Sequence, residues 1–274
     1  MRVGFVGLGS MGGDQARCLV AGKFDLTVFD VYAPAREAFA QTARVASSVA
    51  EVGRNADIVG VCVRDDKQVR ETLEGPDGLL ASMKAGSIIL IHSTIDPETV
   101  IDLAKHAKER GIELLDATVT RTKMDGAGPF VALMIGGSEA ALEKARPVIN
   151  AYATDVFYAG GQGAGAAMKI INNLVTWTSI TTAAQAFRLA AGNGVKLDVL
   201  HALMTSNGNF TRAAGAFSYK FMGGEMDREF MESQLGIGQK DLSLAEELAK
   251  KANLDIPAAA ATRAYLPSAM LDKG

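Results

Sequence analysis

The chain has 274 residues, of which 48% are hydrophobic and 22% are charged, and its formal net charge at pH 7 is −3. This composition is typical of a soluble globular protein with room for one large or two medium-sized domains. Nucleic acid and membrane partners are not expected, because the chain has neither a dense basic cluster nor an apolar run of the roughly 18 residues that a membrane span needs.

The first predicted strand, residues 3–6, runs directly into a glycine-rich turn. Gly7, Gly9 and Gly12 form the pattern G-x-G-x-x-G at the start of a predicted helix. Gly7 allows a tight turn, Gly9 lets the backbone approach a pyrophosphate, and Gly12 permits close packing of helix on strand. The N–H groups of the helix N-terminus would face the phosphates. In this context the pattern predicts a dinucleotide-binding turn.

Asp30 ends the second predicted strand, residues 26–30. At this position an acidic side chain accepts hydrogen bonds from the adenosine ribose hydroxyls, and it repels the 2′-phosphate of NADP. We therefore expect NAD as the cofactor. Arg36 lies near enough in sequence to leave dual use of NAD and NADP open.

Short runs rich in valine and isoleucine alternate with helical patterns over the first part of the chain. Beyond the first two strands, they lie at residues 58–63, 88–93, 113–120, 130–135 and 156–158, with a helix over 139–152. This alternation predicts β-α-β units on a mostly parallel sheet. The fold class is α/β, and the first domain, residues 1–160, is a Rossmann-type dinucleotide-binding domain.

From residue 163 the pattern changes to a helical one. Residues 164–191 contain no proline and a single early glycine, Gly165, and no convincing strand follows up to residue 269. We predict a long helix followed by shorter ones, and therefore an all-helical substrate and dimerisation domain over residues 161–274. Trp177 and its apolar neighbours on the long helix indicate a core or a subunit interface, which favours a homodimer or homotetramer.

Lys169 and Asn173 are one turn apart on the predicted long helix, so both project from one face. Gly163 and Gly165, just upstream, let another backbone or a ligand come close. A lysine and an amide placed in this way can share a substrate. A lysine on a helix face is nevertheless more often solvated than catalytic, so these residues alone do not assign the role.

Six motifs occur in the order found in one enzyme family. They are G-L-G-S-M-G at 7–12, S-T-I at 93–95, D-A-T-V at 116–119, M-I-G-G at 134–137, the segment 163–173, and K-D-L at 240–242. Together they resemble the β-hydroxyacid dehydrogenase family of 3-hydroxyisobutyrate dehydrogenase and its relatives, within the 6-phosphogluconate dehydrogenase superfamily. The resemblance covers nearly the whole chain.

The resemblance implies that Lys169 is the catalytic proton donor and acceptor and that Asn173 orients the substrate. Lys240 would reach over the nicotinamide and so contact both cofactor and substrate. Further cofactor contacts would come from Ser10, Met11, Asp30, Val63 and Thr94, beside the three turn glycines. Hydride would pass between substrate carbon and nicotinamide while the lysine takes or returns the hydroxyl proton. A second cation nearby, such as Lys240, would lower the pKa of Lys169.

The chain departs from the family where a serine-glycine-glycine stretch usually holds the substrate carboxylate. It has Thr120, Arg121 and Thr122 instead, and the Arg-Thr pair resembles the sulfolactaldehyde reductase branch, in which arginine holds a sulfonate. A rigid fork of N–H donors suits a two- or three-oxygen anion. We therefore expect these residues to bind a small anionic substrate, a 3-hydroxy acid or a sulfonate such as sulfolactaldehyde. The alternative is that Arg121 faces solvent or pairs with a surface carboxylate such as Asp125.

The sequence is also compatible with other functions on the same fold. An imine reductase-like enzyme or an inactive NAD(P)-binding regulator could share the fold, but retention of Lys169, Asn173 and Lys240 favours an active dehydrogenase.

The cysteines and histidines lack ligand spacing, so no metal is expected, and we expect His92 to be a hydrogen-bonded strand-end histidine. The N-terminus has no signal-peptide pattern, which predicts a cytoplasmic location. The chain ends before the last helix expected in this family.

Overall fold

The computed structural model describes residues 1–123, 128–211, 214–215 and 228–271. The chain forms two compact units, Met1–Lys169 and Ile170–Gly274. Helix α8 (Ala164–Gly192) begins in the first unit and continues into the second. Asp125, the predicted alternative partner of Arg121, lies outside the described residues.

An eight-stranded sheet forms the centre of the first unit, in the order β3-β2-β1-β4-β5-β6-β7-β8. The strands are β1 Arg2–Val6, β2 Asp25–Phe29, β3 Arg44–Val45, β4 Ile58–Val61, β5 Ile88–Ile91, β6 Glu113–Arg121, β7 Val131–Gly136 and β8 Ala153–Gly160. Strands β1 to β6 are parallel, β7 is antiparallel to β6, and β8 is parallel to β7. The order 3-2-1-4-5-6 is that of a doubly wound dinucleotide-binding sheet. The predicted fold class is confirmed, although β3, an exposed two-residue edge strand, was not predicted.

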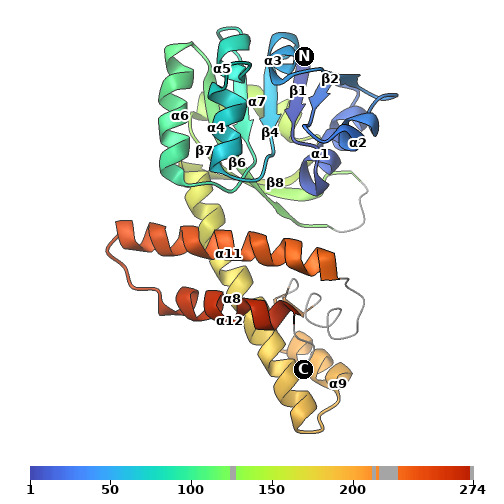
Figure 1. Cartoon of the computed structure of the whole chain (residues 1–274), viewed down its shortest axis with the longest axis vertical. Helices are drawn as coiled ribbons and strands as arrows, with labels where there is room; N and C mark the ends of the chain where they lie inside the picture. Colours follow the sequence, from blue (N-terminus) through green and yellow to red (C-terminus); the bar gives the residue numbers. More distant parts are fainter. Residues whose placement is uncertain (124–127, 212–213, 216–227, 272–274) are drawn as a thin grey trace. The chain divides into compact units, whose positions relative to one another are not determined.

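Helices cover both faces of this sheet (Figure 1). They are α1 Ser10–Ala21, α2 Ala33–Glu37, α3 Val49–Asn55, α4 Asp66–Glu74, α5 Leu79–Ser82, α6 Pro97–Glu109 and α7 Glu139–Ile149. Strand residues alternate between two buried apolar clusters: Ile88 and Leu90 pack with residues of α1 and α7, whereas Ile89 and Ile91 pack with α3 to α6. Alternation arises because successive strand side chains point to opposite faces. The sheet is therefore buried on both sides.

The second unit is helical wherever the structure describes it. Beside the remainder of α8 it contains α9 Leu197–Ser206, α11 Arg228–Lys251 and α12 Pro257–Leu271. Its core includes Trp177 from α8, Leu242 from α11 and Leu266 from α12. A Cβ on Gly238 of α11 would lie 2.6 Å from a Leu266 methyl and 3.1 Å from the Trp177 ring, so these helices pack closely there. In the part of the chain that is described, no helix combines the length and apolar character needed to cross a membrane.

Candidate active site

The glycine-rich turn connects β1 to α1, and each of its three glycines has a distinct environment. Gly7 has a φ of +92°, and a Cβ there would lie 2.2 Å from the Cys62 carbonyl oxygen. A Cβ on Gly12 would lie 2.1 Å from the Gly7 carbonyl oxygen, whereas one on Gly9 would meet nothing within 4 Å. Gly7 and Gly12 are thus required by internal packing, while Gly9 faces open space at the N-terminus of α1. This arrangement fits a bound pyrophosphate.

Asp30, the residue after β2, is hydrogen-bonded to the glycine-rich turn. One carboxylate oxygen accepts a hydrogen bond from the Leu8 N–H at 2.6 Å, and the other accepts one from the Tyr32 N–H at 2.8 Å. Arg36 donates to the Asp30 carbonyl oxygen at 2.6 Å and lies over the Phe29 ring. The carboxylate is therefore rigidly oriented, and an ionised carboxylate can accept further hydrogen bonds beside these two.

The ends of β4 and β5 are joined by Ser93. Its hydroxyl donates to the Val63 carbonyl oxygen at 2.7 Å and accepts from the Val63 N–H at 3.0 Å. Val63 and Thr94 therefore follow neighbouring strands at the carboxyl edge of the sheet, as do the glycine turn and Asp30. Dinucleotides bind at this edge in doubly wound sheets. The structure thus brings the cofactor residues predicted within the first unit to one edge.

His92 is buried and fully engaged within the first unit. Its Nδ1 lies 2.6 Å from the Ala117 carbonyl oxygen, which can only accept, so Nδ1 carries the proton. Nε2 then accepts from the Tyr152 hydroxyl at 3.3 Å, and the ring stacks on Phe5. Burial lowers the pKa of His92 to about 4, against the opposing effect of the Ala117 hydrogen bond. The ring is neutral near pH 7 and has the structural role expected of it.

The first turn of α8, the helix that carries Lys169, is hydrogen-bonded to strand β6. The Asp116 carboxylate of β6 accepts hydrogen bonds from the Gly163 N–H at 3.1 Å and the Ala166 N–H at 2.8 Å. Burial raises the pKa of Asp116, and these two N–H groups oppose that rise. Lys169 follows Ala166 by about one helical turn. Its predicted catalytic role stays a prediction.

The predicted substrate loop continues from the same strand, and its residues alternate between the two sheet faces. Leu115, Ala117 and Val119 belong to the cluster that packs with α1 and α7. By the two-residue period, Arg121 shares their face, whereas Thr120 shares the face of Asp116.

The contacts agree with this alternation. Arg121 forms an ion pair with Asp14 of α1 at 2.8 Å and lies 4.7 Å over the Phe130 ring. Thr122 donates to the Phe130 carbonyl oxygen at 3.0 Å and lies 2.9 Å from the Thr154 hydroxyl. Arg121 thus has a surface carboxylate as partner, as the alternative interpretation anticipated, although the residue is Asp14. Any substrate anion at Arg121 would have to share the guanidinium with it.

In the second unit, two predicted substrate contacts meet at one buried carboxylate. Asp241 of α11 accepts from the Asn173 amide at 2.6 Å and from the Lys240 ammonium at 2.8 Å. The Trp177 ring N–H, at 3.4 Å, points to the same carboxylate. Asp241 is 1% exposed, so its carboxylate is stabilised by these three donors in place of bulk solvent. The Asn173 amide is therefore oriented, with its nitrogen toward Asp241.

Three aspartates in this arrangement were not predicted as site residues: Asp14, Asp116 and Asp241. Asp116 carried a signal, because an acidic residue stands among the apolar residues Leu114, Leu115 and Ala117 in the middle of the predicted strand 113–120. Such a residue needs buried partners. Asp241 lies next to Lys240 in sequence, but a charge beside a charge on a helix more often faces solvent. Nothing in the sequence marks Asp14 as a partner of Arg121.

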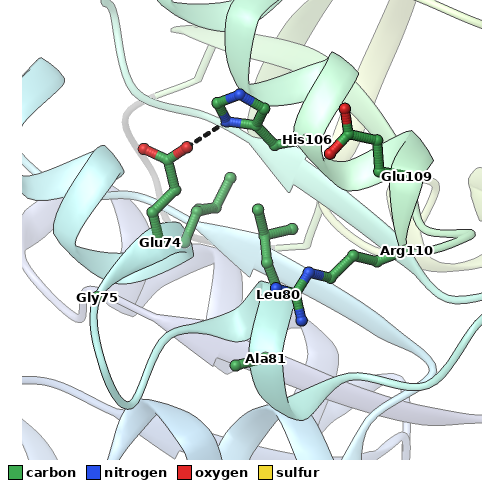
Figure 2. Close-up of a pocket in the computed structure, with 8 residues that line it drawn as sticks. Glu74, Gly75, Leu80, Ala81, His106, Glu109 and Arg110 are labelled. Atoms are coloured by element: carbon green, nitrogen blue, oxygen red, sulfur yellow. Dashed lines mark hydrogen bonds and ion pairs between the residues drawn. The ribbon is translucent and has the colours of Figure 1, made fainter.

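A pocket of about 220 Å³ lies apart from all of these residues (Figure 2). It is lined by Leu73, Glu74, Gly75, Leu80, Ala81, His106, Glu109 and Arg110. Glu74 is the last residue of α4 and Glu109 is the last residue of α6. Both helices run from the carboxyl edge of the sheet back to its amino edge. The His106 ring pairs with Glu74, which raises the pKa of His106. This crevice is at the opposite edge from the cofactor residues.

Two family models together cover most of the chain. The NAD binding domain of 6-phosphogluconate dehydrogenase matches residues 2–160, and the NAD-binding domain of NADP-dependent 3-hydroxyisobutyrate dehydrogenase matches residues 163–274. The chain belongs to the β-hydroxyacid dehydrogenase family. The resemblance drawn from the six motifs is confirmed. This β-hydroxyacid dehydrogenase is accordingly an oxidoreductase that acts on the CH–OH group of short hydroxy acids with a nicotinamide dinucleotide.

Individual relatives match this β-hydroxyacid dehydrogenase over most of its length. An uncharacterized oxidoreductase of Mycobacterium tuberculosis is 36% identical, with 94% of this chain and 89% of the relative covered. The 2-(hydroxymethyl)glutarate dehydrogenase of Eubacterium barkeri is 30% identical (94% and 85%), and the 3-sulfolactaldehyde reductase of Escherichia coli is 27% identical (95% and 87%). The crystal structure of 3-hydroxyisobutyrate dehydrogenase from Salmonella typhimurium matches with a TM-score of 0.86 at 29% identity, covering 98% and 93%.

Proposed function

We propose that this enzyme is an NAD-preferring dehydrogenase or reductase of short anionic hydroxy compounds, in which Lys169 moves the proton. The proposal is carried by one observation: the helix bearing Lys169 is hydrogen-bonded at its first turn to β6, the strand that continues into Thr120 and Arg121. The candidate acid/base, Lys169, and the candidate anion-binding residues Thr120 and Arg121 are thus all close in sequence to the hydrogen bonds that join α8 to β6.

Oxidation removes a hydride from the substrate carbon and a proton from its hydroxyl oxygen, and reduction adds both. A bound NAD would supply the hydride acceptor for oxidation of the carbinol carbon, and NADH the hydride donor for reduction. Lys169 takes the hydroxyl proton as a neutral amine, or donates it to the carbonyl oxygen as an ammonium. The Asn173 amide, oriented by Asp241, would hydrogen-bond the same oxygen and fix the substrate for transfer. Lys240 would contact both cofactor and substrate.

The proposed substrate has an anionic end read by Thr120, Arg121 and Thr122. The relatives are named for 2-(hydroxymethyl)glutarate, 3-sulfolactaldehyde and 3-hydroxyisobutyrate, all short and anionic. The ion pair with Asp14 engages one nitrogen of Arg121. A guanidinium has five N–H donors, so it can bind a carboxylate or sulfonate beside this carboxylate. We favour a 3-hydroxy acid or its sulfonate analogue.

The proposed cofactor residues are Gly7, Gly9, Ser10, Met11, Gly12, Asp30, Val63 and Thr94. The carboxylate of Asp30, fixed by the Leu8 and Tyr32 N–H groups, supports a preference for NAD. The Asp30 carboxylate would repel an NADP phosphate at that position, and the Arg36 guanidinium, which donates to the Asp30 carbonyl oxygen, is the cation that could offset this repulsion.

We propose further that the enzyme is a homodimer or homotetramer. Apolar side chains are exposed on the second unit, among them Leu189 at 70%, Val199 at 57% and Leu203 at 57%. Exposed apolar surface of this kind is typical of subunit interfaces. Sedimentation equilibrium would contradict this proposal if it gave the mass of a single chain at micromolar concentration.

Replacing Lys169 with alanine tests the proposed proton transfer. We expect kcat to fall by at least about a hundredfold, since general acid/base groups typically contribute 10²–10⁴-fold. NAD binding, followed by fluorescence titration, should be unchanged. Lys144→Ala, an exposed lysine on α7, is the matched control and should keep full activity. A Lys169→Ala enzyme within a few-fold of the parent would show that another group moves the proton.

A screen of C3 and C4 hydroxy acids, sulfonates and phosphates for NAD reduction would identify the substrate. An enzyme that binds NAD and turns over none of these compounds, in either direction, would instead fit a cofactor-binding regulator.

A further inference from the structure

Asp116 is a buried acidic residue whose carboxylate accepts hydrogen bonds from main-chain N–H groups. Its side chain is 0% exposed, and its two oxygens accept separate N–H groups, from Gly163 and from Ala166. Both donors lie at the start of α8. A carboxylate that accepts main-chain N–H groups at a helix N-terminus stabilises that end of the helix. Here the carboxylate is on another element, so it also ties the helix to β6.

Two glycines make this close approach sterically feasible. A Cβ on Gly165 would lie 2.5 Å from the Met134 carbonyl oxygen and 2.8 Å from the Asp116 carbonyl oxygen. A Cβ on Gly136 would lie 2.6 Å from the Asp116 carboxylate. A side chain at Gly165 would therefore push α8 away from the sheet, and one at Gly136 would displace the Asp116 carboxylate.

Thr118 adds a second tie between the same elements. Its hydroxyl lies 2.9 Å from the Gly165 carbonyl oxygen and 3.2 Å from the Met134 carbonyl oxygen. Asp116 and Thr118 are alternate residues of β6, so both face α8, and Thr120 is the next residue in that series. The position of the helix is thus set from the strand that leads to the predicted substrate loop.

We propose that Asp116 is a positioning residue that holds the first turn of α8 on β6 and so fixes Lys169 relative to Thr120. The proposal rests on the proposed function of Lys169. Lys169 is about one turn beyond Ala166, so a shift of this turn moves its ammonium by a similar amount. Misplacement of a reacting group by about 1 Å can lower the rate about a hundredfold.

An amide in place of the carboxylate breaks this arrangement without changing its size. The asparagine nitrogen is a donor, so one of the two N–H groups would face another donor. We expect Asp116→Asn to lower kcat by about 10- to 100-fold. The NAD dissociation constant should stay the same, and the substrate deuterium isotope effect on kcat should rise because hydride transfer becomes slower.

The control is Asp57→Asn, the same change at the amino edge of the sheet, where the carboxylate accepts from Arg2 and Lys84. It should lower thermal stability but leave kcat and the isotope effect unchanged. If Asp116→Asn behaves like this control, with kcat per folded enzyme unchanged, Asp116 is only structural and the proposal is wrong.

A double variant separates this proposal from the proposed function. If Asp116 acts through Lys169, then Asp116→Asn should have little further effect on kcat in the Lys169→Ala enzyme. Equal effects in both backgrounds would overturn the positioning role while leaving the lysine assignment intact. A fully active Lys169→Ala enzyme would instead overturn the proposed function. A loss of kcat in Asp116→Asn alone would then have to arise elsewhere, which contradicts the positioning role as well.

Gly165→Ala provides an independent arm, because it displaces the helix while the carboxylate is intact. We expect the same fall in kcat and the same rise in the isotope effect. If either variant fails to fold, Thr118→Val removes the milder tie and should lower kcat about three- to tenfold, in line with the loss of one hydrogen bond. An unchanged kcat in a folded Thr118→Val enzyme would count against the proposal.

Discussion

Two buried aspartates, one in each unit, are held by different kinds of partner. Asp116 is 0% exposed and its carboxylate accepts main-chain N–H groups, whereas Asp241 is 1% exposed and its carboxylate accepts from the side chains of Asn173, Lys240 and Trp177. Two aspartates that are equally buried can therefore have different structural roles. Asp116 fixes the course of the backbone, while Asp241 fixes the orientation of side chains on a backbone that is already placed.

This difference indicates how each carboxylate should affect the kinetics. A change at Asp116 shifts the start of α8, and with it the group proposed to move the proton, so the main effect falls on kcat. A change at Asp241 releases an amide and an ammonium that are proposed to bind substrate, so the main effect falls on KM. Variants at Arg121, Asp14 and Asp30, all more exposed than these two aspartates, extend the comparison.

Among the variants of this comparison, the largest combined effect on stability and kinetics is expected from Asp241→Asn. Hydrogen bonds to charged groups are each worth about 1.5–3 kcal/mol, so we expect a fall of about that size in the free energy of unfolding and a 10- to 100-fold loss in kcat/KM. The loss should appear mainly as a higher KM for the substrate. Denaturant titration and steady-state kinetics measure the two effects. Asp198→Asn, on exposed α9, is the control. If kcat falls and KM does not change, the two aspartates do not differ in the manner described.

Next in size is the effect of Arg121→Ala. Loss of a charge-assisted contact should lower kcat/KM about 10- to 100-fold for an anionic substrate and leave a neutral alcohol of the same length unaffected. Kinetics on such a matched pair of substrates provide the test. An equal effect on both substrates, or no effect on either, would mean that Arg121 only joins β6 to α1.

Asp14→Asn complements this measurement. Asp14 has 36% of its side chain exposed and also pairs with Arg17, so its removal should change the unfolding free energy by less than about 1 kcal/mol. If Arg121 reads the substrate, loss of its competing carboxylate should raise kcat/KM for the anionic substrate and not for the neutral one.

The smallest effect is expected at Asp30, the half-buried residue that follows β2. Net hydrogen-bond contributions of about 0.5–1.5 kcal/mol correspond to about a two- to tenfold change in affinity. Asp30→Ala should therefore narrow the NAD-to-NADP ratio of kcat/KM by about that factor. Steady-state kinetics with both cofactors measure it. Equal efficiency with NADP in the unmodified enzyme would already contradict the assignment.

Much of the fold follows from local sequence patterns. The alternation of apolar strands and helical segments predicts the sheet, because its residues must be buried on both faces. The turn glycines are also predictable from a local pattern. Gly7 and Gly12 must lack a Cβ because each lies against a backbone carbonyl oxygen within the turn or the neighbouring strand end. The edge strand β3 has two exposed residues and no pattern, so it could not be predicted.

What the sequence determined by itself was the type of domain, the edge of the sheet at which the predicted cofactor residues lie, and the family, since each depends on periodicity or on motifs in a fixed order. Tertiary structure decided which residues meet. The pairing of Arg121 with Asp14 and the use of Asp116 as an anchor for α8 join segments far apart in the chain. Such partners depend on how helices and strands pack, and no local pattern encodes a main-chain N–H as the partner of a distant carboxylate.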